Sequence, residues 1–252
     1  MDAELPTVRS DWALFLDIDG TLLEIAATPE SVTVPAELRA NLGALHAAFE
    51  GALAIISGRS IATIDRLFAP LVLPAAGQHG AELRNGEETG GLAPPPRLPA
   101  ILAALEGFAL SHPGILVEAK GLSVALHYRL APEHGIAAWQ FARALIAAEG
   151  DGIELLPGRM AIDFKPRAAD KGSAIEWFLG RAPFQGRVPV FAGDDRTDND
   201  GFAAVNRRGG HSIRVGELGD SAARFGIGSP AALRQWLEAC VGERAKEEAS
   251  RE

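Results

Sequence analysis

Two aspartates separated by one residue lie at the end of an apolar run near the start of the chain. The run is Trp12–Leu16, and Asp17 and Asp19 follow it, with Gly20 directly behind them. Such a run is typical of a buried strand, and side chains two residues apart on a strand point to the same side. Gly20 allows the chain to turn away sharply. Two carboxylates facing one point repel each other, which indicates a site that binds a cation or uses the carboxylates in catalysis.

Three further polar motifs follow predicted strands or begin predicted helices. They are Ser57-Gly58-Arg59, Lys171 at a helix start, and the acidic segment Gly193–Asp198. Phosphoryl transfer needs residues of these kinds together, because it requires an in-line nucleophile and cations that neutralise the equatorial phosphate oxygens. A carboxylate can act as the nucleophile and form an aspartyl-phosphate, provided that a cation offsets its repulsion from the phosphate.

Each motif can supply one part of such a reaction. Mg²⁺ prefers hard oxygen ligands, and Asp17, Asp194 and the backbone carbonyl of Asp19 can supply three of them. Lys171 offers the phosphate a compact positive charge. Ser57 and the amides beside it can donate hydrogen bonds to phosphate oxygens. Asp19 is placed to protonate the leaving alkoxide and then to deprotonate the attacking water.

Taken singly, the motifs have less specific explanations. The first suits a strand-to-turn junction, the second is also typical of a helix N-cap, and a lone lysine at a helix start is most often solvated. The Gly193–Asp198 segment does not fit an EF-hand calcium loop, because Arg196 stands where an oxygen ligand is required and no glycine stands at the sixth position. Ser57 lacks the flanking glycines of a nucleophile elbow. Phosphoryl transfer is the interpretation that accounts for all four motifs together.

Alternating strands and helices must position these motifs. Strands are predicted at Leu14–Asp17, Leu53–Ser57 and Leu71–Ala75, with helices after Pro35 and after Ser60. This alternation is typical of a parallel sheet with helices on both faces, and the active site of such a sheet lies at the carboxyl ends of its strands. Asp17 and Ser57 fall at such ends.

The pattern changes in the middle of the chain. Residues 85–96 are rich in Gly and Pro and predict a loop. Helices are then predicted at 101–110 and from Pro132, and strands at 115–120, 122–129, 153–156 and 160–164, with a turn at Pro157-Gly158. This order favours an antiparallel sheet with helices on one face. The alternation resumes at Lys171, with strands at 188–192 and 212–215 and a last helix from Pro230. We therefore predict an α/β core at 1–83 and 168–252, and an inserted α+β domain at 84–167.

The composition limits the classes of function. The chain has 252 residues, 47% of them apolar, and a net charge of −9. An acidic chain gains nothing from attraction to a phosphate backbone, so no nucleic-acid partner is expected. Cys240 is the single cysteine and falls on the apolar face of a predicted helix, which indicates a buried thiol. Neither a signal peptide nor a membrane-spanning segment is recognisable, so we expect a cytoplasmic protein with no membrane partner, and a monomer is favoured.

The four motifs resemble those of the haloacid-dehalogenase (HAD) superfamily, and residues 12–241 are similar to its bacterial trehalose-phosphatase family. The similarity includes residues 15–22, 55–60, 193–198 and the Gly-Gln-His-Gly-Ala-Glu segment at 77–82. The resemblance implies a Rossmann-like parallel-sheet core with an inserted α+β cap domain. It also implies Mg²⁺ as cofactor and hydrolysis of trehalose 6-phosphate to trehalose and phosphate.

The resemblance further implies roles for individual residues. Catalytic roles fall to Asp17, Asp19 and Lys171, and metal ligation falls to Asp17, Asp19 and Asp194. The phosphate-binding candidates are Gly20, Thr21, Ser57, Gly58, Arg59 and Lys171, with Asp195 and Asp198 in support.

Two cap segments are expected to line the sugar site. In the family, polar residues of the segments that match 118–129 and 158–166 do so, and charged or planar side chains bind hydroxyl groups well. The candidates are Glu118, Lys120, His127, Arg129 and Asp163, with His127 and Arg129 expected on one face of a strand. Each could instead form a salt bridge within the cap. The family usually has Glu where this chain has Asp163 and Asn199, and the shorter Asp163 needs a closer substrate or a bridging water.

Two alternatives remain. The first is another sugar-phosphate phosphatase, for example one acting on sucrose phosphate or mannosyl-phosphoglycerate. The second is a non-catalytic, phosphatase-like regulatory domain. Such a domain is expected to have lost some of the catalytic residues, and all of them are present here.

Overall fold

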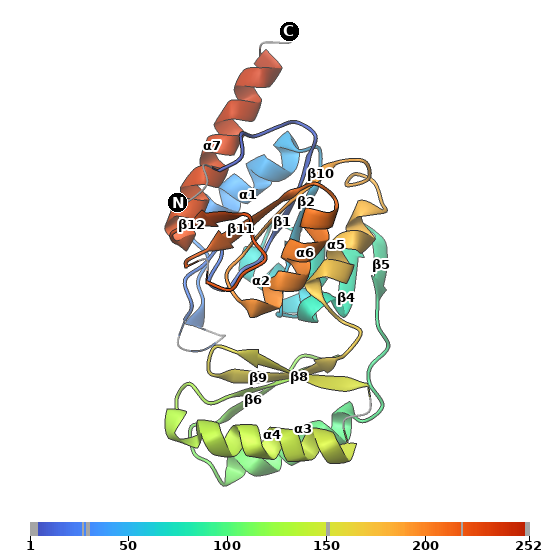
Figure 1. Ribbon diagram of the computed structural model, residues 1–252, viewed down its shortest axis with the longest axis vertical. Helices are drawn as coiled ribbons and strands as arrows, with labels where there is room; N and C mark the ends of the chain where they lie inside the picture. The colour runs from blue at the N-terminus through green and yellow to red at the C-terminus, as the bar shows by residue number, and fades with distance from the viewer. Residues whose placement is uncertain (1–4, 27, 29–30, 150–151, 218, 250–252) are drawn as a thin grey trace. The chain divides into compact units, whose positions relative to one another are not determined.

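The computed structural model describes residues 5–26, 28, 31–149, 152–217 and 219–249, and the chain divides into two compact units. The first unit comprises the residues up to Ile25, Val32–Thr89 and the residues from Asp170 onward. The second comprises Ala26–Ser31 and Gly90–Ala169. Figure 1 shows the elements of each unit. The division into a phosphatase core and a substrate-specificity cap at 84–167 stays a prediction.

A sheet forms the centre of the first unit, where eight strands take the order β12-β11-β10-β1-β2-β3-β4-β5 among the described residues. The strands are β1 (Trp12–Leu16), β2 (Leu53–Ile56), β3 (Ala75–Gly77), β4 (Glu82–Asn85), β5 (Glu88–Gly91), β10 (Val188–Gly193), β11 (His211–Val215) and β12 (Phe225–Ile227). Neighbours from β12 to β3 run parallel, and β4 runs antiparallel to β3. The predicted parallel α/β core is therefore confirmed.

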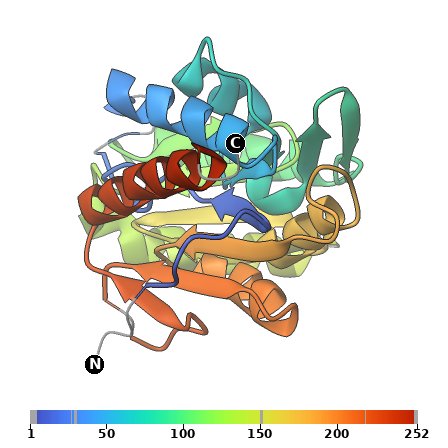
Figure 2. The same ribbon diagram turned by 90° about the horizontal axis from the view of Figure 1, so that it is seen from above.

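Helices cover both faces of this sheet. They are α1 (Ala36–Ala48), α2 (Ile61–Phe68), α5 (Lys171–Leu179), α6 (Asn199–Arg207) and α7 (Pro230–Ala249), with short 3-10 helices η2 (Gln78–Gly80) and η4 (Arg196–Asp198). Because alternate side chains of a strand point to opposite faces, Phe15 of β1 packs with Phe178 of α5 and Phe202 of α6. On the other face, the rings of Trp12 and Trp236 of α7 have centroids 6.1 Å apart. Figure 2 shows α7 (red) beside α1 (light blue) on one side of the sheet.

The second unit is an antiparallel sheet in the order β6-β7-β9-β8 with two helices on one face (Figure 1). Its elements are α3 (Leu98–Leu110), β6 (Leu116–Ala119), β7 (Val124–His127), the 3-10 helix η3 (Pro132–His134), α4 (Gly135–Glu149), β8 (Ile153–Gly158) and β9 (Ala161–Pro166). Leu126 of β7 and Phe164 of β9 pack with Ile101 of α3 and Ala142 of α4. The predicted α-β-β-α-β-β order is confirmed.

Three local predictions were wrong. The strand predicted at Leu71–Ala75 is displaced along the chain, because β3 spans Ala75–Gly77 and residues 71–74 lie in neither a helix nor a strand. The loop predicted at 85–96 contains β5, whose side chains are all exposed, so no hydrophobic alternation marks it in the sequence. The turn predicted at Pro157-Gly158 lies at Arg159-Met160, and Pro157 pairs with Ile162 inside β8. Proline is tolerated there because β8 is an edge strand of its sheet.

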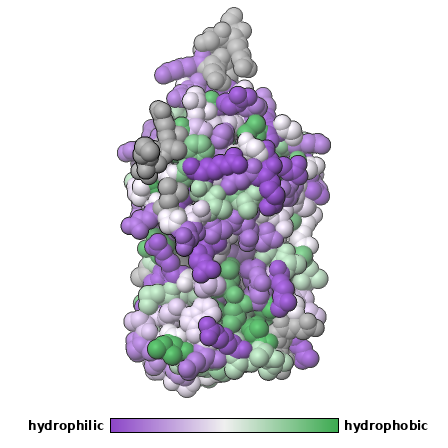
Figure 3. Space-filling model, in the orientation of Figure 1, coloured by the Kyte–Doolittle hydropathy of each residue, from purple (hydrophilic) through white to green (hydrophobic). Residues whose placement is uncertain are grey.

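Exposed large hydrophobic side chains lie mainly in the second unit. They are Leu110, Leu116, Leu130, Ile136 and Met160, with Val72 in the first unit. Most of the face drawn in Figure 3 is hydrophilic, and hydrophobic side chains gather in the lower part of the view. Cys240 is buried, as predicted. Among the described residues, no helix combines the length and the hydrophobicity needed to cross a lipid bilayer.

Candidate active site

The carboxyl ends of β1 and β10 lie side by side and bring two aspartates together. The strands pair in parallel with Leu16 opposite Ala192, and the Asp17 amide donates a 3.0 Å hydrogen bond to the Ala192 carbonyl. Asp194 directly follows β10, and both aspartates are buried. Parallel strand pairing thus places the first and fourth sequence motifs at one point.

Gly20 permits this close approach. Its φ is +82°, and a Cβ atom added to it would lie 2.1 Å from Oδ2 of Asp194. Any side chain at this position would therefore collide with the carboxylate. Thr21 donates from Oγ1 to Oδ1 of Asp194 at 3.2 Å, and the same hydroxyl lies 3.5 Å from Oδ2 of Asp17. Gly20 and Thr21, both predicted to bind phosphate, therefore lie next to Asp17 and Asp194.

Lys171 is brought to the same point by the start of α5. The helix is capped by Asp170, whose side chain accepts a 2.7 Å hydrogen bond from the Ser173 amide. The Lys171 ammonium lies 3.0 Å from Oδ1 of Asp17 and 2.6 Å from Oδ1 of Asp198. Burial lowers the pKa of Lys171, but the carboxylates of Asp17 and Asp198 raise it more, so the pKa lies above its ordinary value. The ammonium therefore stays charged.

The surroundings of Asp17 call for further positive charge. Burial raises the pKa of the Asp17 carboxyl above its ordinary value. Lys171 opposes this rise, whereas the nearby Asp198 and Asp194 carboxylates add to it. A cation bound beside Asp17 would favour its ionised form.

The buried acidic cluster fits a divalent metal ion. Carboxylate oxygens of Asp17, Asp194 and Asp198 lie within 4.8 Å of one another, and hard oxygen donors suit Mg²⁺. Asp198 already has three partners, because Oδ1 contacts Lys171 and Oδ2 accepts 2.9 Å hydrogen bonds from the amides of Asp194 and Asp195. Asp17 and Asp194 are therefore the better candidate ligands. The metal contact predicted for the Asp19 carbonyl stays a prediction.

The two supporting aspartates shape the loop around Asp194. Asp195 caps η4 by accepting a 2.7 Å hydrogen bond from the Thr197 amide, and together with Asp198 it forms a capping box. Arg214 of β11 donates a 3.0 Å hydrogen bond to the Asp195 carbonyl. No sequence pattern pointed to Arg214, because its partner is a backbone atom on a neighbouring strand.

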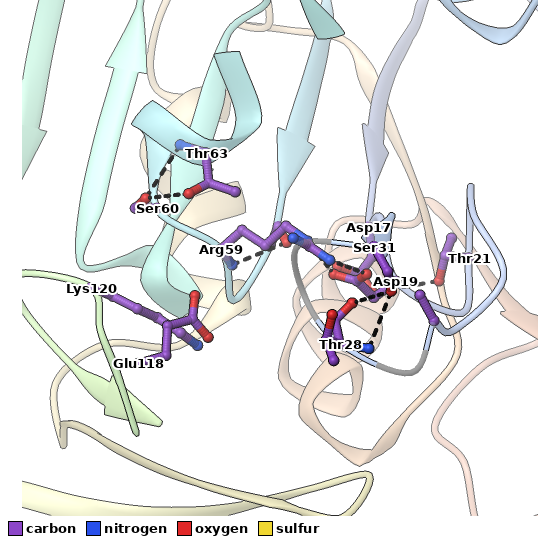
Figure 4. Close-up of polar contacts among 12 residues, drawn as sticks. Asp17, Asp19, Thr21, Thr28, Ser31, Arg59, Ser60, Thr63, Glu118 and Lys120 are labelled. Carbon is purple, nitrogen blue, oxygen red and sulfur yellow. Dashed lines mark hydrogen bonds and ion pairs between the residues drawn. The ribbon is translucent and has the colours of Figure 1, made fainter. Parts of the chain in front are cut away.

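The second motif lies beside Asp19. Ser57 accepts a 3.2 Å hydrogen bond at Oγ from the Arg59 amide, and Ser60 caps α2, the helix predicted to follow it. Figure 4 shows the Arg59 guanidinium directed at the Asp19 carboxylate, to which it donates two hydrogen bonds of 2.6 and 2.7 Å. The Asp19 side chain is 37% exposed, against 7% for Asp17. Arg59, predicted to bind phosphate, thus holds Asp19.

In the second unit, strand register places the predicted sugar-binding residues on one face of the sheet. Glu118 is opposite Ala125, Ala125 is opposite Asp163, and His127 lies two residues further along β7. The other face carries the apolar side chains that pack on α3 and α4. The charged face is therefore the one turned away from the helices of its own unit.

The charged residues of this face are paired with one another. Lys120 Nζ lies 2.7 Å from Oδ1 of Asp163, and His127 Nε2 lies 2.9 Å from Oε2 of Glu118. Burial raises the pKa of Glu118, but the hydrogen bond with His127 and the charge of Lys120 lower it more, so the pKa lies below its ordinary value. The alternative expectation, that these residues pair with one another within their own unit, is therefore met for Lys120 with Asp163 and for His127 with Glu118.

Arg129 differs from the other four candidates. It lies beyond β7, not on the strand face with His127 as predicted. Its guanidinium donates to the backbone carbonyls of Ala26 and Arg159, the latter at 2.7 Å. These contacts stabilise loops of the second unit.

The 77–82 segment lies against the second motif, although sequence analysis gave it no role. Gln78 and His79 are buried, and Glu82 accepts a 2.7 Å hydrogen bond from the Ile61 amide at the start of α2. The available signal was the pair of glycines that flank Gln78 and His79, because glycine permits turns that other residues rarely adopt.

Comparison with known proteins identifies the family. The model of the trehalose-phosphatase family matches residues 15–224. The chain belongs to the trehalose-phosphatase family. It is 41% identical to the trehalose-6-phosphate phosphatase of Escherichia coli (strain K12), over 93% of this chain and 88% of that protein. It is 43% identical to a probable trehalose-phosphate phosphatase of Sinorhizobium fredii, over 84% of this chain and 80% of that protein.

Solved structures of similar fold agree with this family membership. A trehalose-6-phosphate phosphatase related protein matches with a TM-score of 0.75 at 27% identity, over 93% of this chain and 99% of that chain. The C-terminal domain of the Candida albicans trehalose-6-phosphate phosphatase matches with a TM-score of 0.83 at 20% identity, over 93% of each chain. The C-terminal domain of the C. albicans trehalose synthase regulatory protein matches with a TM-score of 0.70 at 16% identity, over 93% of this chain and 94% of that chain. The last two show the fold alone, so function must be argued from the site.

Proposed function

We propose that the protein is a phosphatase that hydrolyses trehalose 6-phosphate to trehalose and inorganic phosphate in trehalose biosynthesis. The observation that carries the proposal is the family match over residues 15–224, joined to the assembly of Asp17, Lys171 and Asp194 at one buried point. The chain also spans most of the length of the bacterial relatives, 88% of the E. coli protein.

In the first step, a carboxylate oxygen of Asp17 attacks the phosphorus atom of the bound ester. The bond between Asp17 and phosphorus forms, the bond from phosphorus to the sugar oxygen breaks, and Asp19 gives a proton to the leaving alkoxide. Lys171, 3.0 Å from Asp17, keeps a positive charge beside the reacting atoms. The product of this step is an aspartyl-phosphate on Asp17.

In the second step, water releases the phosphate. Asp19, now a carboxylate, takes a proton from a water molecule that attacks the phosphorus atom, and Asp17 departs as a carboxylate. The two hydrogen bonds from Arg59 orient Asp19, and each of its oxygens retains a lone pair for the proton. Because the Asp19 side chain is 37% exposed, water can reach it.

Mg²⁺ would be held by the carboxylates of Asp17 and Asp194 and by the backbone carbonyl of Asp19. When bound, the ion supplies positive charge that offsets the repulsion between Asp17 and the phosphate. Asp198 supports this arrangement by fixing the amides of Asp194 and Asp195.

The second unit is the proposed cap, with the sugar bound by the charged face of its sheet. The proposed sugar contacts are Glu118, Lys120, His127 and Asp163. Their side chains pair with one another in this structure and can form hydrogen bonds with sugar hydroxyls instead. The short side chain of Asp163 accepts a hydrogen bond from Lys120, so the two residues can bind the sugar together. A sugar contact for Arg129 remains a prediction, as do a cytoplasmic location and a monomeric state.

Phosphate release from a panel of sugar phosphates tests the proposal. The panel is trehalose 6-phosphate, sucrose 6-phosphate, mannosyl-phosphoglycerate and glucose 6-phosphate, each with and without EDTA. We expect the highest kcat/KM with trehalose 6-phosphate, loss of activity in EDTA and recovery on adding Mg²⁺. A preference for another substrate would favour a different sugar-phosphate phosphatase. A folded protein that releases phosphate from none of them would indicate a regulatory domain.

A further inference from the structure

Three consecutive residues of η2 adopt a left-handed backbone conformation. The φ angles are 49° at Gln78, 60° at His79 and 101° at Gly80. Residues other than glycine rarely adopt this conformation, and it persists only where the surroundings impose it. Such residues cluster at functional sites.

One side of the turn holds the Ser57–Arg59 loop at both ends. The Gln78 amide donates a 2.8 Å hydrogen bond to the Arg59 carbonyl, and the His79 amide donates a 2.9 Å hydrogen bond to the Ser57 carbonyl. The His79 ring covers the middle of the loop, because a Cβ atom added to Gly58 would lie 2.6 Å from its Cε1. All three residues of the loop are therefore in contact with the turn.

The other side of the turn lies against the start of α5. A Cβ atom added to Gly80 would lie 2.6 Å from the Asp170 carbonyl oxygen and 3.2 Å from the Ala174 Cβ. Asp170 is the N-cap of α5, and Lys171 is the next residue. The turn is thus in contact with both the loop of the second motif and the helix that carries the catalytic lysine.

Side-chain hydrogen bonds also hold the turn in place. Gln78 is fully buried and donates a 2.6 Å hydrogen bond from Nε2 to Oε1 of Glu82. Oε2 of the same Glu82 accepts the 2.7 Å hydrogen bond from the Ile61 amide. Movement of the turn would therefore break contacts with β4 and α2 as well.

We propose that the Gln78–Gly80 turn fixes the Ser57–Arg59 loop relative to Lys171, with His79 as a positioning residue for phosphate binding. The inference rests on the proposed function, because it takes the loop and Lys171 to bind the same phosphate group. His79 touches neither substrate nor metal in this scheme, and it acts through Gly58. A shift of about 1 Å in such an element can cost ~100-fold in rate.

The test measures phosphate binding and catalysis in His79→Ala. Inorganic phosphate binding with Mg²⁺ present is measured by calorimetry, and KM and kcat are measured with trehalose 6-phosphate. We expect the phosphate Kd and the KM to rise roughly tenfold and kcat to fall. The reason is that the loop amides would no longer be oriented to donate hydrogen bonds to the phosphate. The Mg²⁺ concentration for half-maximal activity should change by less than about twofold, since the hydrogen bonds of the turn described above go to Ser57, Arg59 and Glu82 and not to the proposed metal ligands.

His211→Ala is the matched control. His211 is a partly buried histidine of the same unit, at the first residue of β11, and its ring lies 5.5 Å from that of Trp12. Its loss should leave the phosphate Kd and the kinetics unchanged. Should His79→Ala not fold, His79→Asn takes its place, because asparagine adopts the left-handed conformation readily while lacking the ring that covers Gly58.

The outcomes separate the inference from the proposed function. A folded variant with a lower Tm but an unchanged phosphate Kd and KM would mean a purely structural turn and would overturn the inference. A wild-type protein that binds phosphate but releases none from trehalose 6-phosphate would contradict the proposed function alone. In that case a weaker phosphate Kd in the His79 variant would still support the positioning role.

Discussion

At the scale of single residues, two aspartates only two positions apart have different surroundings. Asp17 is 7% exposed and lies beside Lys171, whereas Asp19 is 37% exposed and is held by Arg59. A buried carboxylate with a lysine and candidate metal ligands around it suits a nucleophile. A carboxylate open to water suits proton transfer to and from solvent. These different surroundings are in keeping with the different roles proposed for Asp17 and Asp19.

Replacement of the proposed nucleophile should abolish turnover without unfolding the chain. Asp17→Asn keeps the shape of the side chain, but a neutral amide does not attack phosphorus, so kcat should fall by at least ~1,000-fold. Asp11→Asn is the control, because Asp11 contacts only the exposed Arg9 among the side-chain partners described, and its kcat should stay unchanged. Circular dichroism checks the fold of both variants. Near wild-type turnover in Asp17→Asn would rule out the aspartyl-phosphate route.

The acid limb of the pH profile should depend on Mg²⁺. Because burial raises the pKa of Asp17, its carboxylate takes up a proton at a higher pH than an ordinary aspartate does. Activity should therefore fall as the pH decreases through this raised pKa. Mg²⁺ binds only the ionised form, so a higher Mg²⁺ concentration should move the limb to lower pH. Profiles of kcat/KM at two Mg²⁺ concentrations measure the shift, and coincident limbs would count against metal binding at Asp17.

Side-chain types were predictable from the sequence, but their pairings were not. The acidic pairs, Ser57 and Lys171 stood out because their chemistry belongs together at strand ends. The contacts of Lys171 with Asp198 and of Arg59 with Asp19 depend on which strands are neighbours and in what register. A linear sequence does not specify that register residue by residue.

At the scale of elements, strand pairing and one glycine create the site. The parallel pairing of β1 with β10 brings Asp17 to Asp194, and Gly20 leaves room for the Asp194 carboxylate. The elements themselves were predictable, because hydrophobic periodicity marks buried strands and amphipathic helices. The exceptions were β5, whose side chains are exposed, and the β8–β9 turn, where an edge strand tolerates Pro157.

Gly20→Ala should damage the metal site specifically. The new Cβ would lie 2.1 Å from Oδ2 of Asp194 and would displace that carboxylate. The Mg²⁺ concentration for half-maximal activity should rise by about tenfold or more, as for loss of one good ligand contact. Gly186→Ala is the matched control, because Gly186 has a φ of +79° and no atom within 4 Å of an added Cβ. Equal Mg²⁺ requirements in the two variants would contradict a specific displacement of the Asp194 carboxylate.

At the scale of the whole molecule, the two units carry different parts of the proposed activity. The first holds the acidic cluster and Lys171, and the second presents a charged sheet face with paired Lys120 and Asp163. The chemistry of the first unit could be predicted from short motifs. In the second unit the family resemblance named the charged residues, but it did not predict their alignment on one face, which depends on the antiparallel register of three strands.

Substrate choice should therefore be separable from phosphate chemistry. Lys120→Met removes a charged hydrogen-bond donor from the proposed sugar site, which is worth about 1.5–3 kcal/mol. kcat/KM for trehalose 6-phosphate should fall accordingly, by roughly 10- to 100-fold. Turnover of the small ester p-nitrophenyl phosphate should remain, since its hydrolysis needs only the first unit. Lys246→Met, on an exposed position of α7, is the control. An equal loss with both substrates would contradict a sugar-binding role for Lys120.

Chemical trapping of the covalent intermediate tests the central claim most directly. The wild-type enzyme is mixed with Mg²⁺ and trehalose 6-phosphate carrying a radiolabelled phosphoryl group, quenched in acid within milliseconds and digested. The labelled peptide is then identified by mass spectrometry. The account predicts label on the peptide that contains Asp17, and none in Asp17→Asn. Rapid phosphate release with no labelled protein at any quench time, or label on another residue, would contradict it.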